Sequence, residues 1–207
     1  MNLGFHDPLF FLTEAFNMKR ITVPATLGLL LAVSAGAAAQ PAHQTQPTRV
    51  NAAPPTAQQT ASRDVTREKL RTLLNSSGPK INVAFRQSEK QPYNFVGIMR
   101  TGLTNADSFE IVVGVTANET IGFRVFPHYK GAYINVDKVR DSAGLTRLMV
   151  RLSDKNFLYW GADQTFDIFA GYTFTLESGF PDAAIRVVLG SIKNLDQYVG
   201  EMKSSID

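Results

Sequence analysis

The sequence contains no cysteine and only three histidines in 207 residues. Without cysteine the chain has no disulfide, no thiolate metal site and no cysteine nucleophile. His6 and His43 precede the region in which we expect the folded domain, so His128 is the only histidine within it. A hydrolase would need this single residue as its base, beside a nucleophile and an orienting acid, and no such motif surrounds it. The sequence therefore favours a non-enzymatic protein.

The excess of one charge sign is also small. The chain has 21 basic and 18 acidic residues, which gives a net charge of +3. No basic stripe or nucleic-acid motif is present, so we expect no nucleic-acid partner. No phosphate-cradling glycine loop and no metal-ligand spacing occur, and we predict no cofactor and no metal. Asp163 and Asp167 would share a face of a continuous strand, where they could act as an acid–base pair. Turn residues near Asp163 favour solvated surface positions for both instead.

A long hydrophobic run occurs near the start of the chain. Residues 18–39 begin with Met18 and two basic residues, continue as an apolar run and end in three alanines. This layout predicts a Sec-type signal peptide cleaved after Ala39 and a periplasmic or secreted protein. Met18 is then the expected start, and residues 1–17 are an extension outside the fold. An uncleaved anchor is the alternative, but the run barely reaches the roughly 20 apolar residues that a span needs.

Large apolar residues are nearly absent from 40–61, which is rich in proline, glutamine, threonine and alanine. Such a segment cannot bury enough surface to offset its ordering entropy, so we predict a disordered linker. A binding tail or cell-wall spacer is the other interpretation. Residues 62–207 are then expected to form a single domain.

Apolar periodicity within 62–207 predicts alternating helices and strands. The expected elements are a helix from Ser62 or Asp64 to about residue 75, a short strand near 81–87, strands at 93–101, 109–117 and 121–126, a helix from Asn135 or Asp137 to Asn156 with a break or bend at Gly144, strands at 157–162 and 165–177 with Gly171 as a bulge or second turn, and one long helix from Pro181 to Met202. The order α-β-β-β-α-β-β-α predicts an α+β fold with helices packed on one face of an antiparallel sheet.

Aromatic residues are concentrated in the last two expected strands, which also hold the only tryptophan. Alternation places Tyr172 and Phe174 on one face and sets Tyr159 opposite Trp160. Most of such a set is ordinarily core. Aromatics on both faces also fit a face that something other than the protein's own helices covers. The candidate partner-binding residues are Tyr159, Trp160, Phe169, Tyr172 and Phe174.

Three segments carry a resemblance to a known family. They are the helix LRTLLNSSG, the helix LTRLMVRLSDKNF and the tail TFTLESGFPDAAIRVVLGSIKNLDQYV. Over residues 65–202 the chain resembles the YbjN-like family of proposed bacterial sensory transduction regulators. The resemblance implies a type III secretion chaperone-like fold that can dimerise and bind another polypeptide, and it supplies no active-site residues. Secretion chaperones are cytoplasmic and tend to be acidic, so this mildly basic chain with an export signal would share their fold and not their role.

These observations lead to one main expectation and one alternative. The main one is an exported, non-enzymatic protein-binding module of the bacterial cell envelope, chaperone-like or regulatory. Its partner is an unidentified polypeptide, with a homodimer as a further option, and no membrane span remains after signal cleavage. The alternative is a periplasmic protein that binds a small ligand or lipid in an aromatic-lined cavity between sheet and helices.

Overall fold

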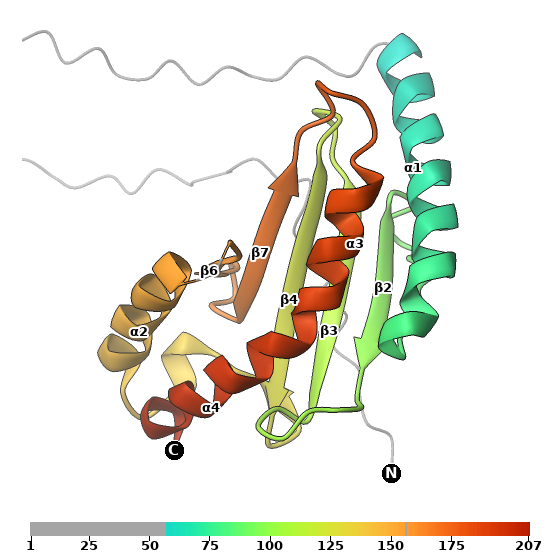
Figure 1. Cartoon of the computed structure of the whole chain (residues 1–207). Helices are drawn as coiled ribbons and strands as arrows, with labels where there is room; N and C mark the ends of the chain where they lie inside the picture. Colours follow the sequence, from blue (N-terminus) through green and yellow to red (C-terminus); the bar gives the residue numbers. More distant parts are fainter. Residues whose placement is uncertain (1–56, 156) are drawn as a thin grey trace, which may run out of the picture. The chain divides into compact units, whose positions relative to one another are not determined.

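An antiparallel seven-stranded sheet with α-helices forms the part of the chain described by the structure (Figure 1). The structure is a computed structural model and describes residues 57–155 and 157–207. The predicted extension and signal peptide, and the linker up to residue 56, lie outside the described residues. The expected α+β class with an antiparallel sheet is confirmed.

The elements follow one another in an order close to the predicted one. They are α1 (Ala57–Ser77), η1 (Gly78–Ile81), β1 (Arg86–Gln87), β2 (Asn94–Met99), β3 (Ser108–Val115), β4 (Ile121–Tyr129), β5 (Ala132–Tyr133), η2 (Val136–Lys138), α2 (Ser142–Lys155), β6 (Tyr159–Ala162), β7 (Ile168–Phe174), α3 (Asp182–Ser191), η3 (Ile192–Asn194) and α4 (Leu195–Ile206), where η marks a 3-10 turn. The sheet order is β1-β2-β3-β4-β7-β6, and β5 pairs with β4. Helix α1 begins ahead of the predicted caps Ser62 and Asp64, so the end of the predicted linker is helical.

The β3–β4 hairpin forms the centre of the sheet. Val115 pairs with Ile121, and the backbone N–H of Thr116 donates to the carbonyl of Thr120 across the turn. Glu119 takes the left-handed conformation, with φ 55°, that so tight a turn requires. The hairpin predicted from the β-branched runs on either side of this turn is confirmed.

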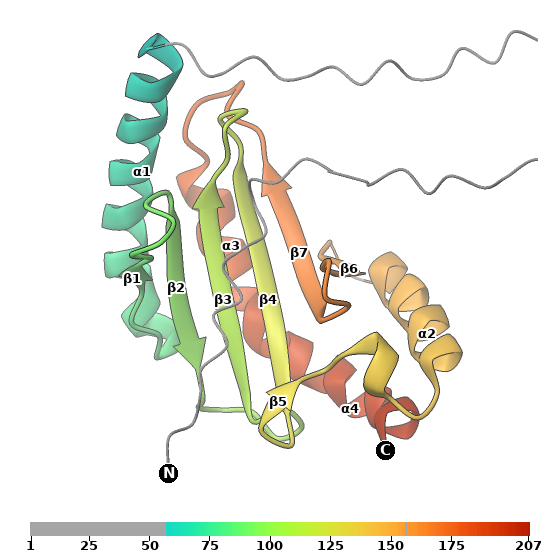
Figure 2. The same cartoon turned by 180° about the vertical axis from the view of Figure 1, so that it is seen from behind.

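Helices α1, α3 and α4 lie on one side of the sheet, as the two opposite views show (Figures 1 and 2). Alternate residues of β3 and β4, such as Phe109 and Phe123, point to this side and are fully buried. The helices contribute the predicted apolar stripe, including Ile185, Leu189 and Val199. Both helices and strands contribute apolar side chains to this main core. For that reason the apolar residues of the sequence show a helical period in some segments and a strand period in others.

The predicted long C-terminal helix is interrupted, which corrects the sequence prediction. The 3-10 turn η3 separates α3 from α4, and α4 leaves the direction of α3 (Figure 1). The buried carboxylate of Asp196, in the first turn of α4, accepts hydrogen bonds from the backbone N–H groups of Thr104, Asn105 and Ala106 at 2.8–3.0 Å. The apolar stripe continues through the turn, so its periodicity could not reveal the interruption. Only the structure shows that α4 begins where Asp196 accepts hydrogen bonds from the loop at residues 104–106.

The start of the middle helix also differs from the prediction. Asn135 caps only η2, by accepting from the N–H of Asp137 at 3.0 Å, and α2 begins at Ser142. Asp141 caps α2 by accepting from the N–H of Gly144 at 2.8 Å. Gly144 therefore lies in the first turn and does not break the helix. A Cβ at this position would lie 2.1 Å from Oδ2 of Asp141, so the glycine leaves room for the capping carboxylate.

Gly171 marks neither a bulge nor a turn. It pairs in regular register with Tyr159 on one side and Arg124 on the other, within a β7 shorter than the predicted 165–177. A Cβ at Gly171 would come within 2.6 Å of Cζ of Tyr159. The glycine makes room for the tyrosine ring, a close approach that strand glycines often permit.

Candidate binding surfaces

The sheet separates the five candidate aromatics onto two faces. Trp160 and Phe174, each 7% exposed, belong to the main core together with the half-buried Tyr172. Tyr159 and Phe169 lie on the face opposite the helices, where their rings meet edge to face at 6.0 Å. The five residues therefore do not form one patch. Trp160, Tyr172 and Phe174 pack on the side of the sheet that carries the protein's own helices.

A second apolar group, the opposite-face cluster, lies on the other side of the sheet from the helices. It consists of Val96, Val112, Phe126 and Phe169, all 4–7% exposed, with the partly buried Tyr133 against them. The ring of Phe126 packs 5.6 Å from Phe169 and 6.0 Å from Tyr133. The cluster crosses strands β2, β3, β4 and β7. Helices α1, α3 and α4 lie behind these strands when this face is viewed in Figure 2.

Charged groups frame the opposite-face cluster. The guanidinium of Arg124 lies 4.6 Å from the centre of the Phe169 ring, a cation–π arrangement. Glu110, 9% exposed, accepts a hydrogen bond from the hydroxyl of Tyr133 at 2.9 Å. Aromatic rings next to an arginine are the composition that protein interfaces favour.

His128 lies on the same face as the opposite-face cluster. Its ring is 4.2 Å from that of Tyr133, and its Nε2 is buried without a hydrogen-bond partner among the described residues. Burial lowers the pKa of His128 from its ordinary value, only partly opposed by the charge of Asp107. Ser108 is its register partner, yet no hydrogen bond joins the two side chains in the described part of the chain. This geometry gives no nucleophile–base pair.

Asp163 and Asp167 stabilise the turn between β6 and β7. Oδ1 of Asp163 accepts from the backbone N–H groups of Thr165 and Asp167, and Asp167 accepts from the side chain of Asn135 at 2.8 Å. Phe166 occupies the left-handed region there, with φ 65°. These contacts assign both residues to the turn, although Oδ2 of Asp163 is buried without a hydrogen-bond partner among the described residues.

Exposed apolar side chains gather around β6, which ends the sheet. Phe157, Tyr159 and Phe166 are 44–50% exposed, and Val150 of the neighbouring helix α2 is 71% exposed. The backbone N–H of Trp160 donates to the hydroxyl of Ser153 in α2 at 2.8 Å, so the helix occupies part of the strand's outer edge. Phe157 and Val150 were not among the partner-binding residues predicted from the sequence.

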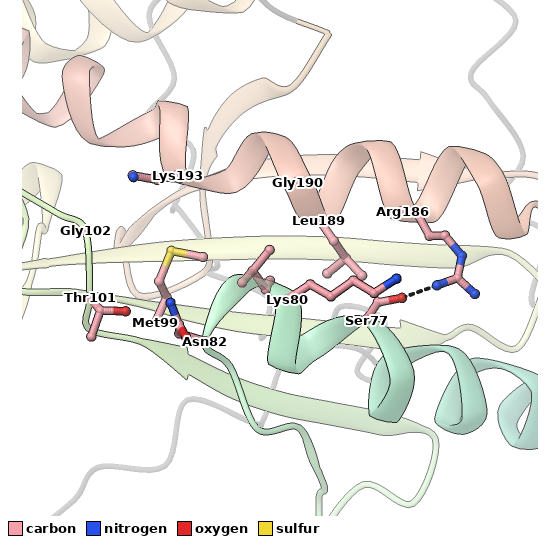
Figure 3. Close-up of a pocket in the computed structure, with 11 residues that line it drawn as sticks. Ser77, Lys80, Asn82, Met99, Thr101, Gly102, Arg186, Leu189, Gly190 and Lys193 are labelled. Carbon is pink, nitrogen blue, oxygen red and sulfur yellow. Dashed lines mark hydrogen bonds between the residues drawn. The ribbon is translucent and has the colours of Figure 1, made fainter.

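A cleft of about 510 Å³ lies where η1, the end of β2 and α3 meet (Figure 3). Its apolar lining includes Ile81, Met99 and Leu189, and its charged lining residues are Lys80, Arg186 and Lys193, with no carboxylate among the lining residues. No sequence signal marked this cleft, because its residues come from segments far apart in the chain.

Comparisons with protein-family models, curated proteins and solved structures found no match for this chain. Among residues 57–155 and 157–207, no helix combines the length and apolar character that crossing a membrane requires. The same residues hold no group of three histidine or acidic side chains placed to bind a metal ion.

Proposed function

We propose that this protein is an exported, non-enzymatic module of the bacterial cell envelope that binds a polypeptide through the sheet face opposite its helices. The observation that carries the proposal is the presence of apolar clusters on both faces of the sheet, while α1, α3 and α4 lie over only one. Beside the buried cluster on the second face, Phe157, Tyr159 and Phe166 around β6 are 44–50% exposed, and exposed apolar side chains that gather in one place commonly mark an interaction site.

Side-chain chemistry supports a polypeptide as the occupant. Tyr159, 44% exposed, presents its ring on this face and packs edge to face on the buried Phe169, and the guanidinium of Arg124 lies against the same Phe169 ring. This mixture suits a peptide chain with apolar and polar side chains better than a uniformly apolar ligand. The resemblance to the YbjN-like family supports a chaperone-like or regulatory role, and the predicted signal peptide supports the cell envelope as its place.

The alternative of a small ligand in an aromatic-lined cavity receives less support. The large aromatic side chains between sheet and helices, Phe109 and Phe123, are 0% and 1% exposed within a packed core. The cleft at η1 has no aromatic lining residue. Binding of a polypeptide therefore accounts for more of the aromatic residues than binding within the core.

Site-specific photo-crosslinking in intact cells tests the proposal. A crosslinking residue in place of Tyr159 or Thr173 presents the probe from the face opposite the helices, whereas one in place of Val187, 64% exposed on α3, is the matched control. We expect a discrete polypeptide adduct from the first two positions and not from the control. An adduct with a second copy of the chain would identify the partner as a homodimer.

A charge variant makes the crosslinking result specific. Thr173 is exposed on β7, so Thr173→Lys should preserve the fold and reduce the Tyr159 adduct, while Val187→Lys should leave the adduct unchanged. Equal adduct yields from all three probe positions, or equal effects of the two lysine variants, would contradict the proposed face.

A further inference from the structure

Helix α2 forms the outer end of the domain beyond β6, and no described element covers its outward side (Figures 1 and 2). Leu145, Met149 and Leu152 turn inward and are at most 6% exposed. Val150 on the outward side is 71% exposed, more than any other large hydrophobic residue that the structure describes. The apolar side of α2 is therefore committed to the core, and Val150 is left at the surface.

Phe157 adds an aromatic ring to the same end of the domain. It follows the last residue of α2 by two positions, is 49% exposed and packs edge to face on Tyr172 with the ring centres 5.9 Å apart. Tyr172 packs against the main core, so Phe157 lies on the helix side of the sheet. The hydrogen bond from Trp160 to Ser153 joins α2 to β6, and Val150 lies one helical turn before Ser153. Two exposed apolar side chains therefore flank the contact between α2 and β6.

The charged residues of α2 are mainly cationic. Arg147, Arg151 and Lys155 recur at intervals of four and are all exposed, so their side chains lie along one side of the helix. Arg151 lies 3.9 Å from Glu201, but both side chains are at least 40% exposed, and such pairs are weak. Arg147 and Lys155 form no ion pair with another described residue. Asp154 is the one acidic residue of α2, which therefore carries three positive charges against one negative charge.

We propose that the outward side of α2 rests on the surface of an anionic lipid bilayer, with Val150 and Phe157 at the boundary between headgroups and acyl chains. The cations of α2 then lie at the lipid phosphates. Positive side chains beside exposed apolar ones are the composition of helices that bind membrane surfaces, and long arginine and lysine stems keep their charges in the headgroup layer. An excess of positive charge matches the negative potential of such a surface.

This contact is peripheral, because α2 has only 14 residues and its apolar side is buried in the domain. It is also distinct from the polypeptide-binding face proposed above, which lies on the side of the sheet opposite the helices. Neither crosslinking position on that face, Tyr159 or Thr173, belongs to the outward side of α2. Either proposal can therefore fail alone.

Vesicle flotation tests the preference for an anionic bilayer. The protein is purified from the cell envelope as the cell processes it, so the unaltered chain and all variants share one N-terminus. We expect binding to vesicles of equal parts phosphatidylglycerol and phosphatidylcholine to be about tenfold tighter than binding to phosphatidylcholine vesicles, and to weaken as salt is added. Equal binding to both kinds of vesicle, or binding to neither, would overturn the proposal.

Matched double variants locate the contact on α2. R147Q/R151Q should bind phosphatidylglycerol vesicles about tenfold more weakly, because it removes two cations from the headgroup layer. R86Q/R100Q removes two exposed arginines of the β1 and β2 region and loses the same charge, so it should bind like the unaltered protein. Equal weakening in the two variants would show general electrostatic attraction and reject α2 as the site.

Tryptophan substitutions test the apolar part of the contact. The emission of Val150→Trp should shift to shorter wavelength when phosphatidylglycerol vesicles are added, because an indole ring enters the membrane interface readily. Val187→Trp is the matched control, since Val187 is 64% exposed on α3, and its emission should stay unchanged. Trp160 is buried and gives both proteins the same background. No shift at position 150, or equal shifts at both positions, would contradict insertion by α2.

Crosslinking in intact cells separates a bilayer from an acidic polypeptide as the partner of α2. A photo-crosslinking residue in place of Val150 should give phospholipid adducts, detected by mass spectrometry. A discrete polypeptide adduct from this position, without phospholipid adducts, would identify a protein partner and overturn the proposal. Phospholipid adducts from position 150 would support it whether or not position 159 gives the polypeptide adduct expected for the other face.

Discussion

The two faces of the sheet differ in what packs against them. The helix-covered face contributes to a large core in which Phe109, Phe123 and Leu145 are at most 1% exposed. The opposite-face cluster has only four buried residues, and their closest ring contacts come from the sheet itself. The comparison teaches that the first face belongs to a large core shared with the helices, whereas the second carries a small buried cluster beside the exposed Tyr159.

Truncation of one large ring on each face tests this difference most directly. Phe123→Ala should lower the free energy of unfolding by about 3–5 kcal/mol, because the cavity lies between sheet and helices and cannot collapse. Phe169→Ala should cost about 2 kcal/mol, because its cluster has only four buried members and no described helix over it, so the cavity can collapse more readily. Urea unfolding monitored by circular dichroism measures both values. Equal costs would mean that the two faces are equivalent cores.

Removal of the Asp196 carboxylate should have the next largest effect, and it acts on the helix-covered side. Burial opposes ionisation of Asp196, but hydrogen bonds from the N–H groups of Ala106, Thr104 and Asn105 and the hydroxyl of Thr104 outweigh it and lower its pKa. Asp196→Ala leaves those donors without their acceptor and should cost about 3 kcal/mol.

Two further variants test whether the cost of Asp196→Ala comes from the lost hydrogen bonds. Asp196→Asn keeps one acceptor oxygen and should cost less than the alanine variant. Asp154→Ala changes an exposed carboxylate on α2 and should have little effect on the unfolding free energy. A cost for Asp154→Ala close to that for Asp196→Ala would argue against the specific role of the loop contacts.

A glycine pair on the opposite face gives a smaller and sharper test. Gly171→Ala should destabilise the protein by about 1 kcal/mol, because the new methyl group meets the Tyr159 ring. Gly122, in β4, lies on the same face of the sheet as Gly171. A Cβ added there would have no described atom within 4 Å, so Gly122→Ala should be neutral or slightly stabilising. In a Tyr159→Ala background the cost of Gly171→Ala should largely disappear. A cost that persists in this background would place the strain elsewhere.

The smallest expected effect is a pH dependence from His128 on the opposite face. Burial lowers the folded-state pKa of His128, so as pH falls through the unfolded-state value of about 6.5 the unfolded chain takes up the proton first. Its contribution to stability is complete above that pH and declines below it, until the folded state is protonated too. His128→Gln should flatten the unfolding free energy between pH 5 and pH 7 relative to the unaltered chain, within about that window. An unchanged slope would show that other groups set it.

Local patterns in the sequence predicted much of the fold. β-branched runs on either side of Asn118 and Glu119 were enough to predict the β3–β4 hairpin, because its pairing depends on residues close in the chain. Pro181 and the apolar stripe after it predicted the C-terminal helical region. The roles of Gly144 and Gly171 were misjudged, because each glycine makes room for a side chain, Asp141 or Tyr159, that periodicity does not take into account.

The candidate sites were less accessible to sequence reasoning. Aromatics on both faces of the last strands were correctly inferred, but whether each lies beneath a helix depends on where α3 and α4 pack. Trp160 and Phe174 entered the main core, whereas Tyr159 and Phe169 did not. The cleft brings together Lys80 and Lys193, which are separated by most of the domain in sequence.

By itself the sequence determined the α+β class, the helix and strand periods and the expectation of export, because these follow from composition and short-range spacing. Tertiary structure alone decided which aromatics are core, where the C-terminal helix is interrupted and that two distant lysines share a cleft. The physical reason is that burial and charge proximity are properties of three-dimensional packing, which alternation along one strand or helix does not contain.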